Sequence, residues 1–306
     1  MNRRRPVQRS VPDDNGSAIT TAPLSRQAAL ERGRSVLSAR SGADAQREAL
    51  YLMAGVLGTT PGQAALERDR TLGERELMEY EARLARRARG EPLQYIEGRA
   101  AFRRLSLHVD RSVLIPRPET EQLVEHVLDW CRGRERLRAV DLGTGSGAIA
   151  ISLALEGPFQ DVVGVDISLD ALNVARANAA GAGVAARVDL RQGSLFRALG
   201  PRERFHVVVS NPPYIALGEA DALPAEVREW EPELALFAGP SGLEMIEQIV
   251  EGAPDHLEDG GLLALEVAPD SAAAAIERIR AHGEYGEARL IRDLAGHQRI
   301  VLAERL

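Results

Sequence analysis

The chain of 306 residues contains a single cysteine, Cys131, so it can form no internal disulfide. That usage fits a reducing compartment, and we expect a cytoplasmic protein. No apolar run approaches the roughly 20 residues that a membrane-spanning helix needs, so no membrane contact is predicted. Arg3 to Arg5 have the charge that begins a signal peptide, but Pro, Asp, Asn and Gly follow them instead of an apolar segment.

An excess of basic residues is also missing. The 38 Lys and Arg residues face 45 Asp and Glu residues, which gives a formal net charge of −7. A nucleic-acid footprint usually needs a basic face, so we expect no direct nucleic-acid substrate. No internal repeat is found, and no metal site is predicted. The apolar content of 44% is ordinary for a globular protein, and the length suits one large or two smaller domains.

The first third of the chain divides by composition and period. Residues 1–24 have few large apolar side chains and are predicted to be a disordered tail. Residues 25–92 have a helical period, with Ser25 as the first helix cap and a break at residues 60–62. The arginine-rich run at residues 83–89 is interpreted as a solvated helix face, with contact to an acidic partner as the alternative.

A connector at residues 93–118 follows. Residues 94–98 and 102–109 alternate apolar and polar side chains around turns, and we expect both stretches to form a β-hairpin. Residues 119–306 then alternate strands and helices, which predicts a mostly parallel sheet with helices on both faces. Within this region we expect a helix at residues 243–257 and a turn at Gly260 and Gly261.

The stretch at residues 138–155 predicts a buried strand, a glycine-rich turn and a helix that starts near Ala148. Gly143, Gly145 and Gly147 have no Cβ, so a ligand can lie against the backbone, and free N–H groups at the helix start add donors. The spacing is G-x-G-x-G, and by itself it is a weak signal, because a tight turn without a ligand needs similar glycines.

Two later stretches strengthen the prediction of a ligand site. Residues 162–166 are predicted to be the next strand and end in Asp166, 19 positions after Gly147, where nucleotide-binding units place an acid that reaches ribose hydroxyls. Residues 205–210 form an apolar strand that runs into Asn-Pro-Pro-Tyr at residues 211–214. This rigid, polar loop is expected at the carboxyl end of a strand, where open α/β sheets bind ligands.

The glycine turn, Asp166 and the Asn-Pro-Pro-Tyr loop together resemble a class I S-adenosylmethionine (SAM)-dependent methyltransferase. Residues 114–121, Leu-Ile-Pro-Arg-Pro-Glu-Thr-Glu, narrow the resemblance to the protein-(glutamine-N5) methyltransferases that act on class 1 peptide chain release factors. The resemblance implies an α/β Rossmann-like domain with a mostly parallel seven-stranded sheet, whose last strand is antiparallel. It also implies a small N-terminal helical domain that docks the factor, a β-hairpin connector, SAM as cofactor and the glutamine of a Gly-Gly-Gln loop as acceptor.

The resemblance also implies site residues. Those expected to bind the cofactor are Gly143, Thr144, Gly145, Ser146, Gly147, Asp166, Leu195 and Asn211. Those expected to be catalytic are Asn211, Pro212, Pro213 and Tyr214. The Asn211 side-chain oxygen would accept one N–H of the acceptor amide and the Pro212 carbonyl the other, while Tyr214 would flank the amide plane.

Some positions depart from the family pattern. Arg103 and Arg104 stand where the family commonly has an aromatic residue and a glycine, and residues 193–195 lack its acidic and aromatic residues. The resemblance implies that Arg117, Glu119 and Thr120 border the active site; alternatively Thr120 or Glu119 caps the following helix, and one residue can do both. The alternatives are a ribosomal-protein glutamine methyltransferase, a nucleic-acid adenine methyltransferase and a SAM-binding protein without catalysis.

Overall fold

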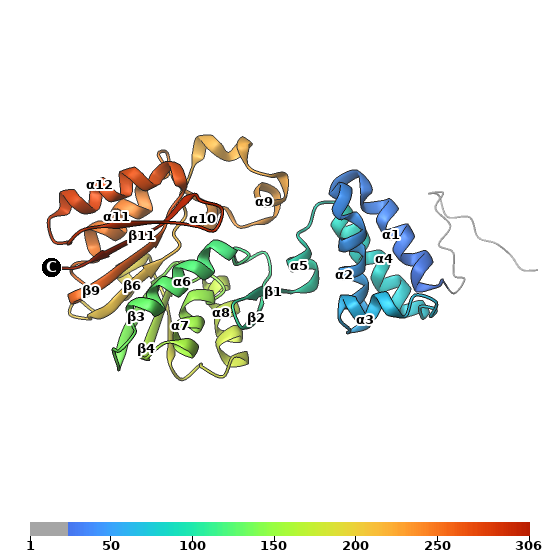
Figure 1. Ribbon diagram of the computed structural model, residues 1–306, viewed down its shortest axis with the longest axis horizontal. Coiled ribbons are helices and arrows are strands. Elements are labelled where there is room, and N and C mark those ends of the chain that lie inside the picture. Colours follow the sequence, from blue (N-terminus) through green and yellow to red (C-terminus); the bar gives the residue numbers. More distant parts are fainter. Residues whose placement is uncertain (1–23) are drawn as a thin grey trace, which may run out of the picture. The chain divides into compact units, whose positions relative to one another are not determined.

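The computed structural model describes residues 24–306, which form two compact units (Figure 1). The first unit ends at Ala88 and the second begins at Arg89. Apart from Leu24, the predicted disordered tail lies outside the described residues. The domain limits predicted after residues 92 and 118 remain predictions.

The first unit is helical, as the sequence period predicts. The Ser25 hydroxyl accepts a hydrogen bond from the Ala28 backbone at 3.2 Å and caps the first helix. Thr60 and Gln63 form a capping box at the start of a later helix, whose first residue is Pro61, so the predicted break is confirmed. The described elements of the first unit are α1 (Arg26–Ser41), η1 (Gly42–Asp44), α2 (Ala45–Leu57), α3 (Pro61–Leu66) and α4 (Glu74–Ala88).

The arginine-rich end of α4 is not uniformly solvated, so that expectation was wrong. Arg87 is buried, and its guanidinium donates hydrogen bonds to both carboxylate oxygens of Glu48 on α2 at 2.8 and 2.9 Å. Leu84 and Tyr80, on the same face of α4, are also buried. Residues 80, 84 and 87 lie three and four positions apart, so the inward face of the helix continues into the arginine run.

The second unit begins with α5 (Leu93–Glu97) and a hairpin of β1 (Arg99–Phe102) and β2 (Leu105–His108). The hairpin was predicted, but residues 94–98 were expected as strand; residues 94–97 belong to the helix α5, and Gly98 caps it in the left-handed conformation. Arg103 occupies the hairpin turn at a φ of +52°. Its guanidinium pairs with Glu156 and Glu125, both at 2.8 Å, which fastens the turn to the helices that follow.

The core of the second unit is a seven-stranded sheet in the order β10-β11-β9-β6-β3-β4-β5. Neighbouring strands are parallel, except that β11 is antiparallel to both β9 and β10, which confirms the implied topology. The strands are β3 (Leu137–Leu142), β4 (Phe159–Asp166), β5 (Val188–Gln192), β6 (Phe205–Ser210), β9 (Leu257–Glu266), β10 (Arg289–Arg292) and β11 (Gln298–Glu304).

Helices cover both faces of this sheet (Figure 1). Successive strand residues point to opposite faces, so Ala139 packs in one apolar cluster and Val140 in the other. On the face of Ala139 lie α6 (Pro118–Trp130), α7 (Ala148–Glu156) and α8 (Leu169–Gly181). On the face of Val140 lie α11 (Glu244–Gly252) and α12 (Ala272–His282).

Short elements occupy the connections between the strands and helices of the sheet. They are η2 (Leu195–Ala198), β7 (Ile215–Ala216), η3 (Leu217–Ala222), α9 (Ala225–Trp230), α10 (Glu233–Leu236), β8 (Phe237–Gly239) and η4 (Pro269–Ser271).

The structure corrects the expectation for residues 243–261. The helix α11 ends at Gly252, because Pro254 has no N–H with which to continue it. The strand β9 begins at Leu257 and contains Gly260 and Gly261, which were expected as a turn. The pairing of β9 with β6 shifts at this point, so that Gly260, at a φ of +70°, lies in a bulge of the strand.

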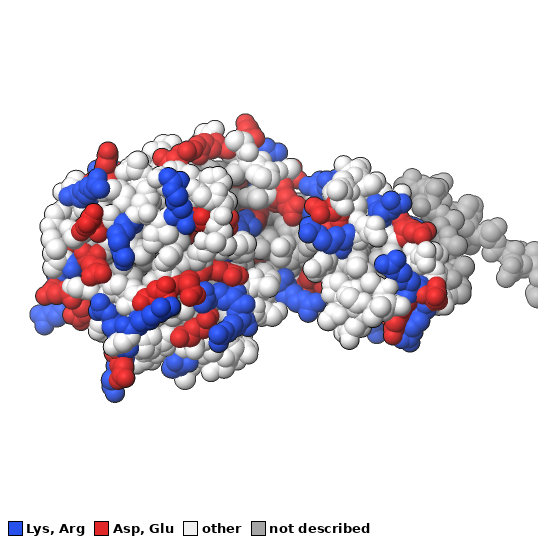
Figure 2. All heavy atoms as spheres, viewed as in Figure 1, with Lys and Arg blue, Asp and Glu red and all other residues white. Residues whose placement is uncertain are grey.

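The face of the second unit seen in Figure 2 carries basic and acidic side chains close together, with neither sign covering it alone. Within residues 24–306, no helix has both the length and the apolar composition needed to cross a bilayer. In the same range, no group of three His, Cys, Asp or Glu side chains is placed to hold a metal ion.

Candidate active site

The turn between β3 and α7 is held in a conformation that suits glycine. Gly143, Gly145 and Gly147 have φ angles of +76°, +54° and +81°, which side chains with a Cβ rarely adopt. A Cβ added to Gly143 or Gly145 would meet no heavy atom within 4 Å, whereas one added to Gly147 would lie 2.9 Å from Ile151 Cδ1. The first two glycines therefore border open space, and the third packs against the core.

Asp166, at the end of β4, supports this turn. One carboxylate oxygen accepts a hydrogen bond from the Gly145 N–H and the other from the Ser168 N–H, both at 2.9 Å. Burial raises the pKa of Asp166, while these hydrogen bonds oppose the rise. The cap of α8 is Ser168, whose hydroxyl accepts from the Ala171 N–H at 3.2 Å. Asp166 thus faces the glycine turn rather than capping the helix.

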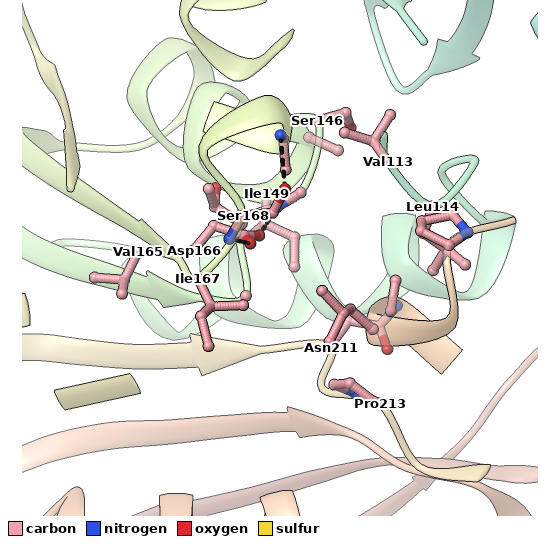
Figure 3. A pocket seen from close by; sticks show the side chains of 18 of the residues that line it. Val113, Leu114, Ser146, Ile149, Val165, Asp166, Ile167, Ser168, Asn211 and Pro213 are labelled. Atoms are coloured by element: carbon pink, nitrogen blue, oxygen red, sulfur yellow. Dashed lines mark hydrogen bonds between the residues drawn. The ribbon is translucent and has the colours of Figure 1, made fainter. Parts of the chain in front are cut away.

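A cavity of about 290 Å³ lies beside the turn, close to the lower limit for ligand pockets. In Figure 3, Asp166 and Leu114 lie on opposite sides of it, with Asn211 and Pro213 along one edge between them. The predicted site residues that line the cavity are Gly143, Thr144, Gly145, Ser146, Asp166, Leu195, Asn211 and Pro213. Those that do not line it are Gly147, Pro212 and Tyr214.

The connector forms a second wall of the cavity. This role of the connector was not predicted from the sequence. Val113 and Leu114 line the cavity, and the Tyr95 hydroxyl on α5 donates a hydrogen bond to the Val113 carbonyl at 2.6 Å. Arg117 also lines it and donates a hydrogen bond at 2.6 Å to Glu231, a buried carboxylate before α10. Burial raises the pKa of Glu231 above its ordinary value, and the charge and hydrogen bond of Arg117 oppose that rise.

Asn211 follows β6 and is held by side chains from two other elements. Its Nδ2 donates a hydrogen bond to Thr120 Oγ1 at 3.0 Å, and the Thr120 hydroxyl donates to Glu266 Oε2 at 2.7 Å. Thr120 is the third residue of α6 and lines the cavity, so it borders the site and its hydroxyl does not cap the helix. Glu266 ends β9 and is only 1% exposed. Burial raises the pKa of Glu266 to about 7.

Glu266 was not predicted, because it lies 146 residues from Thr120 and no local pattern marks it. Asp141, within β3, was also missed. Its Oδ2 accepts hydrogen bonds from the Thr144 hydroxyl at 2.6 Å and the Ala150 N–H at 3.2 Å, so it holds both ends of the glycine turn. Its Oδ1 is buried and contacts no hydrogen-bond donor among the described residues. Burial raises the pKa of Asp141 to about 7.

Pro212 and Tyr214 lie beside the cavity lining. Pro212 is buried, and Tyr214 is partly buried against the apolar cluster beneath α11 and α12. Burial raises the pKa of Tyr214, and the charge of Glu266 raises it further. The carbonyl of Tyr214 would lie 2.7 Å from a Cβ added to Gly242, so only glycine fits closely there. The roles implied for Pro212 and Tyr214 stay predictions.

Known proteins resemble both units. Residues 28–98 match the family described as PrmC N-terminal domain, and residues 119–225 match the methyltransferase small domain. A release factor glutamine methyltransferase from Rhodopirellula baltica is 41% identical over 237 residues, which cover 76% of this chain and 80% of that protein. One from Gloeobacter violaceus is 46% identical over 211 residues, covering 69% and 73%.

Among solved structures, a methyltransferase from Pyrococcus furiosus has a TM-score of 0.50 and 20% identity, covering 74% of this chain and 98% of that one. This likeness shows a shared methyltransferase fold.

Proposed function

This chain belongs to the family of release factor glutamine methyltransferases, and we propose that it methylates the side-chain amide nitrogen (N5) of a glutamine in class 1 peptide chain release factors. The glutamine would be that of the Gly-Gly-Gln loop, and SAM would be the methyl donor. The observation that carries the proposal is that Asn211 lines the same cavity as the glycine turn and Asp166, within one compact unit.

The glycine-turn side of the cavity fits SAM. The backbone at Gly143 and Gly145 borders open space, so a ligand can approach it closely. Each carboxylate oxygen of Asp166 accepts one backbone hydrogen bond and has a further lone pair for a ribose hydroxyl. When bound, SAM supplies a methyl group on a positively charged sulfur, and the protein has to bind and orient it.

The Asn211 side of the cavity fits a primary carboxamide. Such a nitrogen is a poor nucleophile, because its lone pair is delocalised into the carbonyl. The Asn211 Nδ2 is engaged by Thr120, which leaves the Oδ1 to accept an N–H from the acceptor. We propose that the Pro212 carbonyl accepts the second N–H, so that both hydrogens are held and the nitrogen faces the methyl group. Holding reactants at near-attack distance can contribute roughly 7 to 11 kcal/mol.

Three further elements belong to this proposal. The first helical unit docks the factor, nucleic acid is not the substrate, and the protein works in the cytoplasm, where release factors act. The reaction needs no strong general base beside Asn211, because a protonated amide nitrogen is very acidic and loses its excess proton after transfer.

Labelled SAM tests the proposal directly. We expect label to enter a Gly-Gly-Gln release factor and not the same factor with Gln→Ala in that loop. A DNA or RNA fragment and a ribosomal protein that is methylated on glutamine serve as competing acceptors. Label in the nucleic acid, or in the ribosomal protein, with none in the factor would contradict the proposed substrate. Label in the Gln→Ala factor would contradict the proposed residue.

A further inference from the structure

Two hydrogen bonds connect Asn211 to a buried carboxylate across three elements of the fold. The Asn211 Nδ2 donates to Thr120 Oγ1 at 3.0 Å, and Thr120 donates its only hydroxyl hydrogen to Glu266 Oε2 at 2.7 Å. An ionised carboxylate can only accept, so Glu266 takes the Thr120 hydrogen bond. The Thr120 oxygen is then left to accept, and Asn211 has to present its NH₂ group to it.

We propose that Thr120 and Glu266 are positioning residues, which fix the Asn211 carboxamide with its oxygen toward the methyl acceptor and so select an acceptor that presents N–H groups. The inference rests on the proposed function and deepens it. Thr120 is 4% and Glu266 is 1% exposed, so the hydrogen bond between them is shielded from water, whereas the bond from Asn211 to Thr120 is partly buried. Neither residue has to touch the reacting atoms.

The orientation needs fixing because a carboxamide is nearly symmetric in shape. Half a turn about χ2 exchanges the oxygen and the NH₂ group of Asn211 with little change in packing. In the turned state its NH₂ would meet the NH₂ of an acceptor glutamine, so two donors would oppose each other. That state would instead suit a carboxylate, which only accepts. We call the hydrogen bond from Asn211 to Thr120, with the bond from Thr120 to Glu266, the Thr120 anchor. By fixing Asn211, this anchor discriminates between a glutamine and a glutamate at the acceptor position.

The charges around Glu266 bear on the anchor. Glu119, in the first turn of α6, raises its pKa, whereas Arg299 on β11 and Arg117 before α6 lower it. Tyr214, from the loop after β6, is within electrostatic reach of the carboxylate. Protonated Glu266 can donate to Thr120, and the Thr120 hydroxyl is then free to donate to the Asn211 oxygen. The anchor thus loses its direction as Glu266 becomes protonated.

Removing the Thr120 hydroxyl is the first test. We expect Thr120→Val to lower kcat for the release factor by about 10- to 100-fold, because a misplaced positioning group costs that much, with SAM affinity unchanged. Thr120→Ser keeps a hydroxyl and should restore most of the rate. Ser152→Ala is the matched control, since it removes a buried hydroxyl on α7 that no described residue hydrogen-bonds, and it should leave kcat unchanged.

A double-mutant cycle shows whether Thr120 acts through Asn211. Adding Thr120→Val to Asn211→Ala should give no further loss of kcat, because the group that Thr120 orients is already gone. Equal losses in the two backgrounds would overturn the proposal and make Thr120 a structural residue. The proposal would also be overturned if Thr120→Val unfolds the unit or lowers SAM affinity as much as kcat.

Competition by a factor with Gln→Glu in its Gly-Gly-Gln loop tests the discrimination. For each enzyme we compare inhibition by the Gln→Glu factor with inhibition by the Gln→Ala factor. The ratio of the two should be about threefold or more higher for Thr120→Val than for the wild type. An unchanged ratio would overturn the specificity role. If the wild type methylates no release factor at all, the proposed function fails, and the specificity role that rests on it fails with it.

Glu266→Gln provides a second variant that keeps the shape of the side chain. Its amide does not titrate, so its hydrogen bonding to Thr120 is the same at every pH, and the fall in wild-type kcat from about pH 8 to about pH 6 should be absent in this variant. The same fall in both proteins would contradict the role of Glu266.

Discussion

The glycine-turn side of the cavity is built from residues close in the sequence, whereas the Asn211 side joins residues far apart. Asp166 accepts from Gly145, 21 positions away, and Asp141 holds Thr144 and Ala150 within nine positions. On the other side, Thr120 lies 91 positions from Asn211 and 146 from Glu266. The first side can form from the consecutive elements β3, α7 and β4, and the second exists only when α6, β6 and β9 are all in place.

The two sides also differ in the groups that they present. Around Gly143 and Gly145 the cavity is bordered by backbone. The groups presented there are peptide groups, and the absence of a side chain is what exposes them. Around Asn211 the polar groups are side chains, each with one orientation that satisfies its neighbours. We therefore expect substitutions on the first side to affect cofactor binding or folding and those on the second to affect transfer.

The largest expected effect is that of Asn211→Ala on transfer. Loss of a preorganised hydrogen-bonding group at the reacting atoms should lower kcat by about 10² to 10³-fold, while SAM affinity stays near that of the wild type. Single-turnover rates and calorimetric SAM binding measure the two quantities. An equal loss of both would mean that Asn211 belongs to the cofactor side.

Gly147→Ala should act on folding rather than on the site. The added Cβ would take a φ of +81° and lie 2.9 Å from Ile151 Cδ1, so we expect the free energy of unfolding to fall by about 2 to 4 kcal/mol. Gly181→Ala is the control, since a Cβ at this helical position meets nothing within 4 Å. Denaturant unfolding measures both variants, and an unchanged Gly147→Ala midpoint would contradict the packing.

Asp166→Ala should weaken SAM binding by about 1 to 3 kcal/mol, the usual cost of deleting a charged hydrogen-bond partner. Part of the loss would come from the Gly145 and Ser168 N–H groups that Asp166 holds. At saturating SAM, kcat should change little, in contrast to Asn211→Ala. Asp166→Asn, which keeps one acceptor oxygen, should lose less affinity; unchanged SAM affinity in both variants would remove Asp166 from the site.

The smallest expected effect is on how the free energy of unfolding varies with pH. The pKa of Glu266 is about 7 in the folded protein, above its value of 4.5 in a model peptide. Between these values the folded state binds more protons than the unfolded state, so the contribution of Glu266 to stability falls as pH rises. The unfolding free energy of Glu266→Gln, minus that of the wild type, should therefore increase from about pH 4.5 to about pH 8. A constant difference would contradict the raised pKa.

Local patterns in the sequence were enough to predict the sheet and its alternation of strands and helices, because apolar periodicity and turn residues act over short distances. They also placed Gly143, Gly145, Asp166 and Asn211 at strand ends, which meet at one edge of a parallel sheet. Where a local pattern was ambiguous, the prediction was wrong. The stretch before Gly98 alternates like a strand but forms the helix α5, and the arginine run of α4 continues an inward face.

The surroundings of Asn211, and the residues that stand away from the cavity, depend on how the elements pack. Glu266 ends a strand without any motif, and its pairing with Thr120 depends on the packing of α6 against β9. Gly147 belongs to the same glycine pattern as Gly143, yet a Cβ added to it would meet Ile151 and Ala175 in the core. Hydrogen bonds between distant side chains depend on how the elements pack together. The periodicity of a single segment does not predict that packing.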